Sequence, residues 1–279
     1  MSVAETGRVT VEEGVVFGHG GGRELKCDVY TPPGNPTHAP GVLLVHGGGW
    51  SGGDRTQLKG HGILLGRAGY VCVTAEYRLS GEAKWPAPLH DVKAALRWMR
   101  ANASRLGIDP TRIAVSGNSA GGHLSLMVAG TPNVAEFEGD GGNPGVDTAV
   151  VACVAIYPPV ELKPDSPLTG AVGMLMGEGA SDAAYLAASP MTHVKANFPP
   201  TLLIHGNKDE LVPEEASLSI YRALRKAGAA AELHIYADQP HAFDASPVFG
   251  RQTVQVMDLF LRRYVVEAAE APAALGASR

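Results

Sequence analysis

A short glycine-flanked serine segment, GNSAG at residues 117–121, has the composition of a turn that exposes a reactive hydroxyl. An apolar run precedes it and a helical run follows it, so the pattern predicts a strand, a sharp turn and a helix. Glycine is needed at both ends of the turn because a Cβ atom there would collide with the neighbouring backbone. The segment therefore predicts that Ser119 is a nucleophile.

Three consecutive glycines, Gly47, Gly48 and Gly49, follow His46 directly after another apolar run. Backbone N–H groups without flanking side chains can approach a substrate closely and stabilise the oxyanion that forms when an ester carbonyl becomes tetrahedral. We assign these donors to Gly48, Gly49 and the N–H of Ala120. An ordinary glycine-rich turn is the alternative, and a phosphate-binding loop is disfavoured because no Gly-Lys-Ser/Thr follows.

A serine hydroxyl needs a base, and in chains with this type of turn the acid and the histidine follow the serine in sequence. Asp209 comes soon after the apolar run 201–205, and His241 comes soon after the run 232–236. Both are therefore expected in loops at the carboxyl ends of strands. We assign Asp209 as the acid and His241 as the base, with Glu210 as the rival acid.

Several neighbouring side chains are expected to support this site. Trp50 and Trp85 are candidates for the wall of a substrate pocket, and core packing is the alternative for each. His46 is expected to brace the glycine loop through a hydrogen bond, and His205 to be packed or at the surface within a strand. The strand end at 76–78 is expected to form an ion pair that holds the loop.

Apolar runs alternate with helical periods from about residue 40 onward, which indicates parallel strands joined by crossover helices. The runs lack alternation, which is typical of strands that helices cover on both faces. Two earlier runs, 9–17 and 23–30, do alternate and predict a hairpin at the sheet edge. The expected parallel strands are residues 41–46, 70–76, 112–116, 149–156, 201–205 and 232–236, and the expected helices include 88–105, 213–228 and 247–266.

The predicted fold class is therefore α/β, with a mostly parallel central sheet, helices on both faces and an antiparallel N-terminal hairpin. We expect a single domain over residues 1–279, because α/β folds often exceed 200 residues.

Segment 158–200 has no clear period and lies where open α/β sheets bind ligands, so it is expected to form a small lid or a wall of the acyl pocket. Segment 136–147 is acidic and glycine-rich, but its spacing does not match an EF-hand, so a solvated loop is favoured over a metal site.

Composition excludes several classes of partner. The net charge is −5 with no basic run, which argues against nucleic acid binding. No secretion signal or apolar run of the roughly 20 residues needed for a membrane helix is evident, so a cytoplasmic protein is expected. The three cysteines lie far apart without zinc-ligand spacing, and we expect neither metal nor cofactor. The expected partner is a small-molecule ester, and the expected state is a monomer or homodimer.

The motifs HGGGW, GNSAG, HGNKDELVP and HAF, in this order, resemble the hormone-sensitive-lipase-like serine esterases of the α/β-hydrolase superfamily. The stretches EYRLSGEAKWPAPLHDVKAALRWMR and EFEGDGGNPG are similar to a bacterial branch of small carbohydrate-esterase-like and formamidase-like hydrolases. The resemblance implies an α/β-hydrolase fold and favours Asp209 over Glu210. Two departures stand out: residues 77–82 read YRLSGE where that group usually has YRLAPE, and only 45 residues precede His46. A large N-terminal cap is therefore not expected, and the acyl site is expected to be open.

These features together predict a metal-independent serine carboxylesterase that hydrolyses short-chain or small esters through an acyl-enzyme. An arylformamidase-like amide hydrolase is one alternative, because the same machinery cleaves activated amides. A catalytically silent binding module with a hydrolase fold is the other, although such proteins often lose a residue of the triad.

Overall fold

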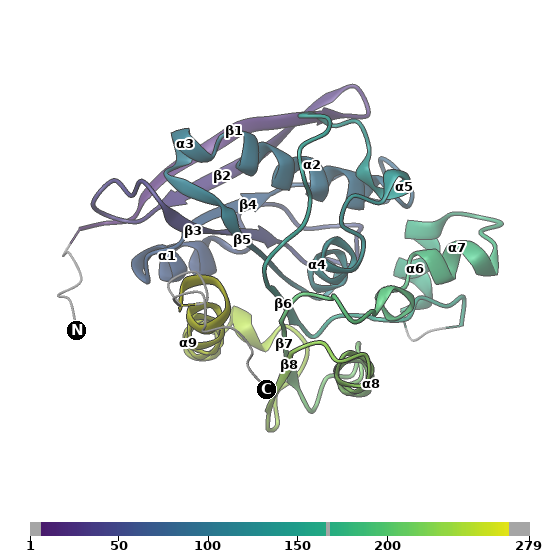
Figure 1. Cartoon of the computed structure of the whole chain (residues 1–279). Coiled ribbons are helices and arrows are strands. Elements are labelled where there is room, and N and C mark those ends of the chain that lie inside the picture. The colour runs from purple at the N-terminus through teal and green to yellow at the C-terminus, as the bar shows by residue number, and fades with distance from the viewer. Residues whose placement is uncertain (1–6, 166–167, 268–279) are drawn as a thin grey trace, which may run out of the picture.

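The central sheet has eight strands within the residues that the computed structural model describes, 7–165 and 168–267 (Figure 1). The strand order is β1-β2-β4-β3-β5-β6-β7-β8. The hairpin of β1 (Thr10–Gly20) and β2 (Arg23–Thr31) lies at one edge, and β2 pairs antiparallel with β4 (Val71–Ala75). The remaining neighbours pair in parallel, as β4 does with β3 (Ala39–Val45). The predicted mostly parallel sheet with an N-terminal hairpin, an α/β-hydrolase fold, is confirmed.

Four parallel strands complete the sheet and place the functional loops. They are β5 (Ile108–Asn118), β6 (Cys153–Ile156), β7 (Thr201–Gly206) and β8 (Ala231–Tyr236). Their register aligns the strand ends, because Asn118 lies opposite Ile156 and Ile156 lies opposite Ile204. The residues that follow these positions therefore meet at one edge of the sheet.

Strand β6 is shorter than the predicted run 149–156. The guanidinium of Arg100 donates to the carbonyl oxygen of Ala149 at 2.7 Å, and the carboxylate of Asp147 accepts from the Ala149 N–H at 3.0 Å. Side chains therefore hold the start of this run, and its regular pairing with β7 begins only at Cys153.

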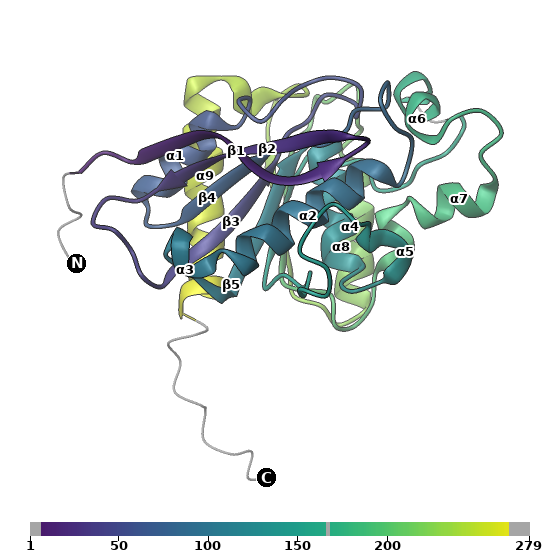
Figure 2. The ribbon, with the colours of Figure 1, turned by 90° about the horizontal axis from the view of Figure 1, so that it is seen from above.

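Helices cover both faces of the sheet, as predicted (Figures 1 and 2). The buried apolar side chains of α1 (Lys59–Arg67) and α9 (Pro247–Leu261) belong to one cluster. Those of α2 (Ala87–Ala101), α4 (Ala120–Gly130) and α8 (Glu215–Lys226) belong to a second cluster on the opposite face.

The helix boundaries differ from the predictions at three places. The predicted helix 88–105 is divided at Asn102 into α2 and α3 (Ala103–Leu106), and Gly107 ends it with a φ of 69°. The predicted helix 247–266 changes after Leu261 into the π-helical turn η3 (Arg262–Glu267). Helix α1 is not predicted from the sequence, since glycines disfavour helices. One of them, Gly62, is required by packing, because a Cβ there would lie 2.8 Å from the Tyr30 ring.

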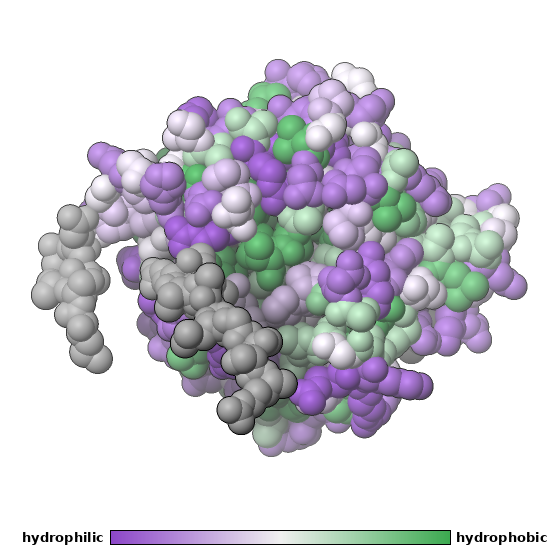
Figure 3. All heavy atoms as spheres, viewed as in Figure 1, coloured by the Kyte–Doolittle hydropathy of each residue, from purple (hydrophilic) through white to green (hydrophobic). Residues whose placement is uncertain are grey.

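Segment 158–200 carries short helices at the side of the molecule where the functional strands end (Figure 1). They are α6 (Thr169–Met176), α7 (Asp182–Ala187) and the 3-10 turn η1 (Pro190–His193). Figure 3 shows apolar residues gathered at α6 and α7, where Met174 and Leu186 are exposed. Among the described residues no helix combines the length and apolar character needed to cross a bilayer.

Segment 136–147 packs against α2 rather than standing free in solvent. Its first residues end the short helix α5 (Ala135–Glu138). The Glu138 carboxylate accepts from the buried Lys93 ammonium at 2.7 Å and from the Arg97 guanidinium at 3.0 Å. The prediction of a solvated surface loop is therefore wrong at Glu138, because two buried cations of α2 require a counter-charge.

Candidate active site

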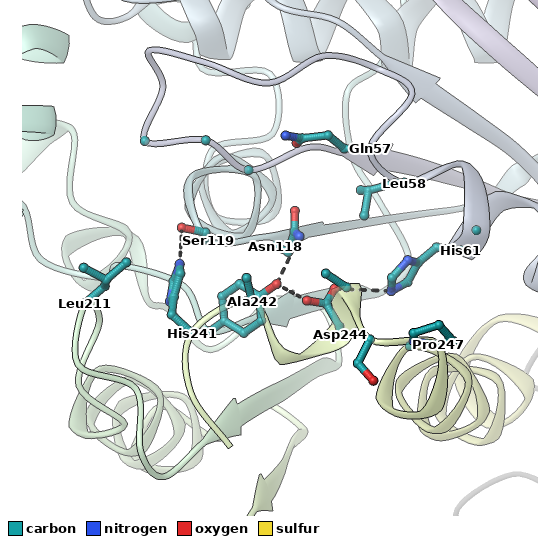
Figure 4. A pocket seen from close by; sticks show the side chains of 18 of the residues that line it. Gln57, Leu58, His61, Asn118, Ser119, Leu211, His241, Ala242, Asp244 and Pro247 are labelled. Carbon is teal, nitrogen blue, oxygen red and sulfur yellow. Dashed lines mark hydrogen bonds and ion pairs between the residues drawn. The ribbon is translucent and has the colours of Figure 1, made fainter. Parts of the chain in front are cut away.

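Three loops at the carboxyl ends of β5, β7 and β8 bring Ser119, Asp209 and His241 together. Ser119 follows β5 directly, Asp209 lies in the loop after β7, and His241 lies between β8 and the 3-10 turn η2 (Phe243–Ala245). Figure 4 shows Ser119 and His241 facing one another at the cavity wall. The three residues predicted as a triad thus share one site.

The serine stands on a strained turn. Ser119 has φ 52° and ψ −119°, a conformation that non-glycine residues rarely adopt. Its N–H donates to the Ile156 carbonyl at 2.8 Å, which fixes the turn against β6. A Cβ at Gly121 would collide with the backbone of β3, so α4 can start this close to the sheet only with glycine there.

A continuous hydrogen-bond chain links the three side chains. The Ser119 hydroxyl lies 3.0 Å from His241 Nε2, and His241 Nδ1 lies 2.6 Å from Asp209 Oδ2. Because a carboxylate can only accept, the proton of the neutral imidazole is on Nδ1 and Nε2 is free to accept the serine proton. The arrangement can therefore activate the hydroxyl for attack.

Asp209 is buried and all its acceptor capacity is used. Oδ1 accepts the N–H groups of Leu211 at 3.0 Å and Val212 at 2.8 Å. Besides His241, Oδ2 faces His205 Nε2 at 3.3 Å. Burial by itself would raise the pKa of Asp209, but the hydrogen bonds from His205, His241 and Val212 outweigh it and hold the pKa well below its usual range. The group stays ionised at any pH at which the imidazole can act as a base.

His205 is a supporting residue whose role the sequence did not reveal. It is fully buried in β7, and its Nε2 lies 2.8 Å from the Val212 carbonyl oxygen as well as near Asp209. Its Nδ1 accepts from the Ser217 hydroxyl at 2.7 Å, so its proton is on Nε2. The expectation that it is packed within a strand is correct. It contacts Asp209 because the loop after β7 turns back toward the strand.

The glycine loop lies beside the serine. Gly48 and Gly49 have φ values of 115° and 59°, and a Cβ at Gly47 would lie 3.3 Å from the Ser119 Cβ. Within the described residues, the N–H groups of Gly48, Gly49 and Ala120 donate to no protein acceptor. These amides are therefore available to a substrate oxygen.

His46 supports this glycine loop from the side of the core. It is buried, its Nδ1 lies 2.8 Å from the Gly47 carbonyl oxygen, and its ring stacks on Tyr77 with centroids 4.3 Å apart. The Tyr77 hydroxyl donates to the His46 carbonyl at 3.0 Å. Glu76 and Arg78 on either side form the expected ion pairs. Glu76 pairs at 3.3 Å with Arg55 in the loop that follows the glycines and at 2.7 Å with Arg23, and Arg78 pairs at 2.8 Å with Asp91.

A cavity of about 1000 Å³ opens at the serine and is bounded by α1, the start of α6 and the start of α9 (Figure 4). Its reacting end holds Ser119, His241 and the glycine loop. Apolar side chains dominate the rest. Polar groups are added by His61, Asp244, Gln57, Asn118, Tyr157, Ser246 and Arg251. The apolar lining comprises Leu58, Ile63, Leu64, Leu168, Ala171, Leu211, Ala242, Ala245 and Pro247.

Neither predicted tryptophan lines this cavity. Trp50 is 1% exposed, and its indole N–H donates to His123 Nδ1 at 3.2 Å on α4. Trp85 packs against the rings of His123 and Phe137, with centroids 5.7 Å and 6.0 Å away. Both side chains therefore pack in the core and not at the cavity wall. Trp50 has a positive φ of 56° and points inward, away from the surface that the glycines present.

No group of three or more His, Cys, Asp or Glu side chains with the geometry of a metal site occurs in 7–165 and 168–267. The three cysteines are buried and unpaired, and burial raises the pKa of Cys27 to about 12. A thiol held in this way is a poor nucleophile.

Residues 27–224 match the BD-FAE family. A probable carboxylic ester hydrolase of Mycobacterium tuberculosis, LipM, is 36% identical over 222 residues, which is 74% of this chain and 50% of that relative. The chain thus spans half the length of this curated relative.

Two solved structures share the fold. A truncated carbohydrate esterase from gut microbiota superposes with a TM-score of 0.82 at 26% identity, over 94% of this chain and 98% of that one. Esterase 2 of Thermogutta terrifontis with bound propionate superposes with a TM-score of 0.79 at 26% identity, over 94% and 97%.

Proposed function

The chain belongs to the BD-FAE family, and on this premise we propose that it is a serine carboxylesterase that hydrolyses small carboxylic esters. The observation that carries the proposal is the chain of hydrogen bonds from Ser119 through His241 to Asp209, beside the backbone amides of the glycine loop. Esterase activity in the similar proteins supports the same reaction class.

In the proposed reaction, Ser119 attacks the ester carbonyl while His241 Nε2 takes its proton. Asp209 then stabilises the imidazolium without taking a proton itself. The amides of Gly48, Gly49 and Ala120 hold the developing oxyanion, and each such donor contributes about 3 kcal/mol to lowering the barrier. The alcohol leaves with the proton from His241, and water hydrolyses the acyl-enzyme by the same route.

The cavity supports a largely apolar substrate of modest size. About 1000 Å³ lies at the upper end of the usual range for small-molecule sites, and the lining is largely apolar. The Thermogutta esterase holds propionate, a short acid. We propose short acyl groups on alcohols larger than ethanol as the substrates.

Replacing the nucleophile tests the proposal directly. Ser119→Ala removes the attacking oxygen, and we expect hydrolysis of p-nitrophenyl acetate to fall by about 10⁴-fold or more. The thermal unfolding temperature should stay at or above that of the parent, because alanine removes only the hydroxyl and adds no group that could clash. A fluorophosphonate probe should label the parent and leave the variant unlabelled.

Activity that persists in Ser119→Ala would exclude the proposed nucleophile. A parent chain that the fluorophosphonate probe does not label, and that hydrolyses no ester across C2 to C12 acyl groups, would instead support a silent binding module. The same substrate series with N-formylkynurenine added would show whether amide hydrolysis dominates.

A further inference from the structure

A tyrosine at the end of β6 occupies the position between the nucleophile and the acid. Tyr157 follows Ile156, which lies opposite Asn118 on one side and Ile204 on the other. The Tyr157 N–H donates to the Ile204 carbonyl at 2.7 Å, just as the Ser119 N–H donates to Ile156. The backbone at this point is therefore tied to both strands that carry the site.

The conformation of this residue is unusual. Tyr157 has a φ of 39°, in the left-handed region that bulky residues rarely enter. Its side chain is fully buried. Strain of this kind persists only where the surrounding structure requires it, and it clusters at functional sites.

The ring and the hydroxyl of Tyr157 reach both reacting loops. Its ring centroid lies 4.6 Å from that of His241, inclined at 57°. Its hydroxyl accepts from Asn118 Nδ2 at 3.1 Å and donates to Asp244 Oδ1. Asn118 immediately precedes the nucleophile and Asp244 follows the base by three positions, so one hydroxyl joins the two loops.

Asp244 anchors this connection. Its side chain is 2% exposed, and Oδ2 lies 3.4 Å from His61 Nε2 on α1. Figure 4 shows Asn118, Asp244 and His61 along one line of contacts beside the Ser119 and His241 pair. Burial and the neighbouring Asp244 raise the pKa of the Tyr157 hydroxyl well above its ordinary value, so the hydroxyl is protonated and can donate near neutral pH.

From this geometry we propose that Tyr157 is a positioning residue, which holds the His241 ring between Ser119 and Asp209. The inference rests on the proposed esterase function. His241 is partly exposed and is carried by a short loop, in which Ala242 also has a positive φ. Its Nε2 must point at the Ser119 hydroxyl to accept the proton, and a misplacement of about 1 Å can reduce a rate by about 100-fold.

The test removes the hydroxyl and keeps the ring. For Tyr157→Phe we expect kcat for p-nitrophenyl acetate to fall by about 10- to 100-fold with KM within about threefold of the parent, since the cavity keeps its shape. Tyr236→Phe is the matched control, because that ring packs on Phe243 and not on His241. It should leave kcat unchanged.

A second measurement needs no ester. The proton shared by His241 Nδ1 and Asp209 gives a low-field proton magnetic resonance in a well-held triad. We expect this resonance in the parent and in Tyr236→Phe, and its broadening or loss in Tyr157→Phe. A parent that shows the resonance but hydrolyses no ester would refute the proposed function and leave the positioning role to be judged by this signal.

A second variant covers the case in which Tyr157→Phe does not fold. Asp244→Ala removes the acceptor of the hydroxyl and should lower kcat to a similar extent. If both variants fold, the double variant should be no slower than the slower single one, because both changes break one connection. A kcat of Tyr157→Phe within threefold of the parent, a retained resonance, or fully additive losses would each overturn the proposal.

Discussion

Two carboxylates in this molecule, one buried and one half-buried, differ in the donors that surround them. Asp209 has a fully buried side chain and meets two imidazoles, His241 at 2.6 Å and His205 at 3.3 Å. Glu138 is 21% exposed and meets two cations, Lys93 and Arg97, at 2.7 Å and 3.0 Å. Both carboxylates are satisfied, so the number of hydrogen bonds does not distinguish a reactive site from a structural one.

The difference lies in whether the donors can change their protonation state. An imidazole gains and loses a proton near neutral pH, so a carboxylate beside it can stabilise a charge that appears only during a reaction. The Arg97 guanidinium keeps its charge, and although burial lowers the pKa of Lys93, its hydrogen bond to Glu138 opposes that shift. Glu138 therefore neutralises the cations that α2 buries. Asp209 should thus matter for rate and Glu138 for stability.

The largest expected effect comes from removing the charge of Asp209. In Asp209→Asn the amide N–H₂ can donate to His241 Nδ1, which places the imidazole proton on Nε2 and prevents it from accepting the serine proton. We expect kcat for p-nitrophenyl acetate to fall by about 10⁴-fold, while the chain still folds. Steady-state kinetics and circular dichroism measure the two quantities.

Glu210→Gln is the neighbouring control, because Glu210 is exposed and should leave kcat nearly unchanged. A large loss in Glu210→Gln together with a small loss in Asp209→Asn would show that the rival carboxylate is the acid.

The reverse pattern is expected at the structural carboxylate. Glu138→Gln leaves the buried Lys93 and Arg97 without a counter-charge, and we expect the free energy of unfolding to fall by about 3 kcal/mol with kcat nearly unchanged. Urea denaturation gives the first quantity and ester hydrolysis the second. Glu136→Gln, on the exposed side of α5, should cost less than about 0.5 kcal/mol. The distinction between the two carboxylates would be lost if Glu138→Gln impaired kcat and left stability intact.

The sequence was sufficient for the features that depend on local signals. Continuous apolar runs predicted the strands, and the motif around Ser119 predicted the turn. Asp209 and His241 could be selected because parallel strands end at one edge of the sheet, so that residues following two of them come close together. These inferences need only the order of the elements and the side chains next to each strand end.

Features that depend on distant pairing could not be predicted. Glu138 meets Lys93 across 45 positions, and His205 meets Asp209 only because the loop turns back toward β7. The direction of Trp50 depends on a single positive φ, which no pattern of apolar residues reports. Tyr157 ends an ordinary apolar run, and only its contact with His241 distinguishes it from a core tyrosine.

The last effect concerns His123, a buried imidazole for which the described residues supply no carboxylate partner. Its Nε2–H donates to the Ala188 carbonyl at 2.7 Å and its Nδ1 accepts from Trp50. Burial lowers its pKa to about 4, against about 6.5 in an unfolded chain. Between these values the unfolded chain binds the extra proton, so this group should reduce stability as pH falls from about 6.5 to 4, by about 1.4 kcal/mol per pH unit at most.

His123→Gln tests this slope, because the amide can still donate to Ala188 but does not titrate. The variant should be less stable than the parent at pH 7, and the difference in the free energy of unfolding should shrink as urea denaturation is repeated toward pH 4.5. His46 and His61 are also buried with lowered pKa values, so the variant should keep part of the slope. A difference that stays constant over this range would mean that His123 accepts its proton in the folded chain as readily as in the unfolded one. The folded chain would then tolerate an imidazolium with the Ala188 carbonyl as its acceptor and the Trp50 indole N–H facing its second N–H, so a carboxylate beside an imidazole would not be needed to keep it protonated.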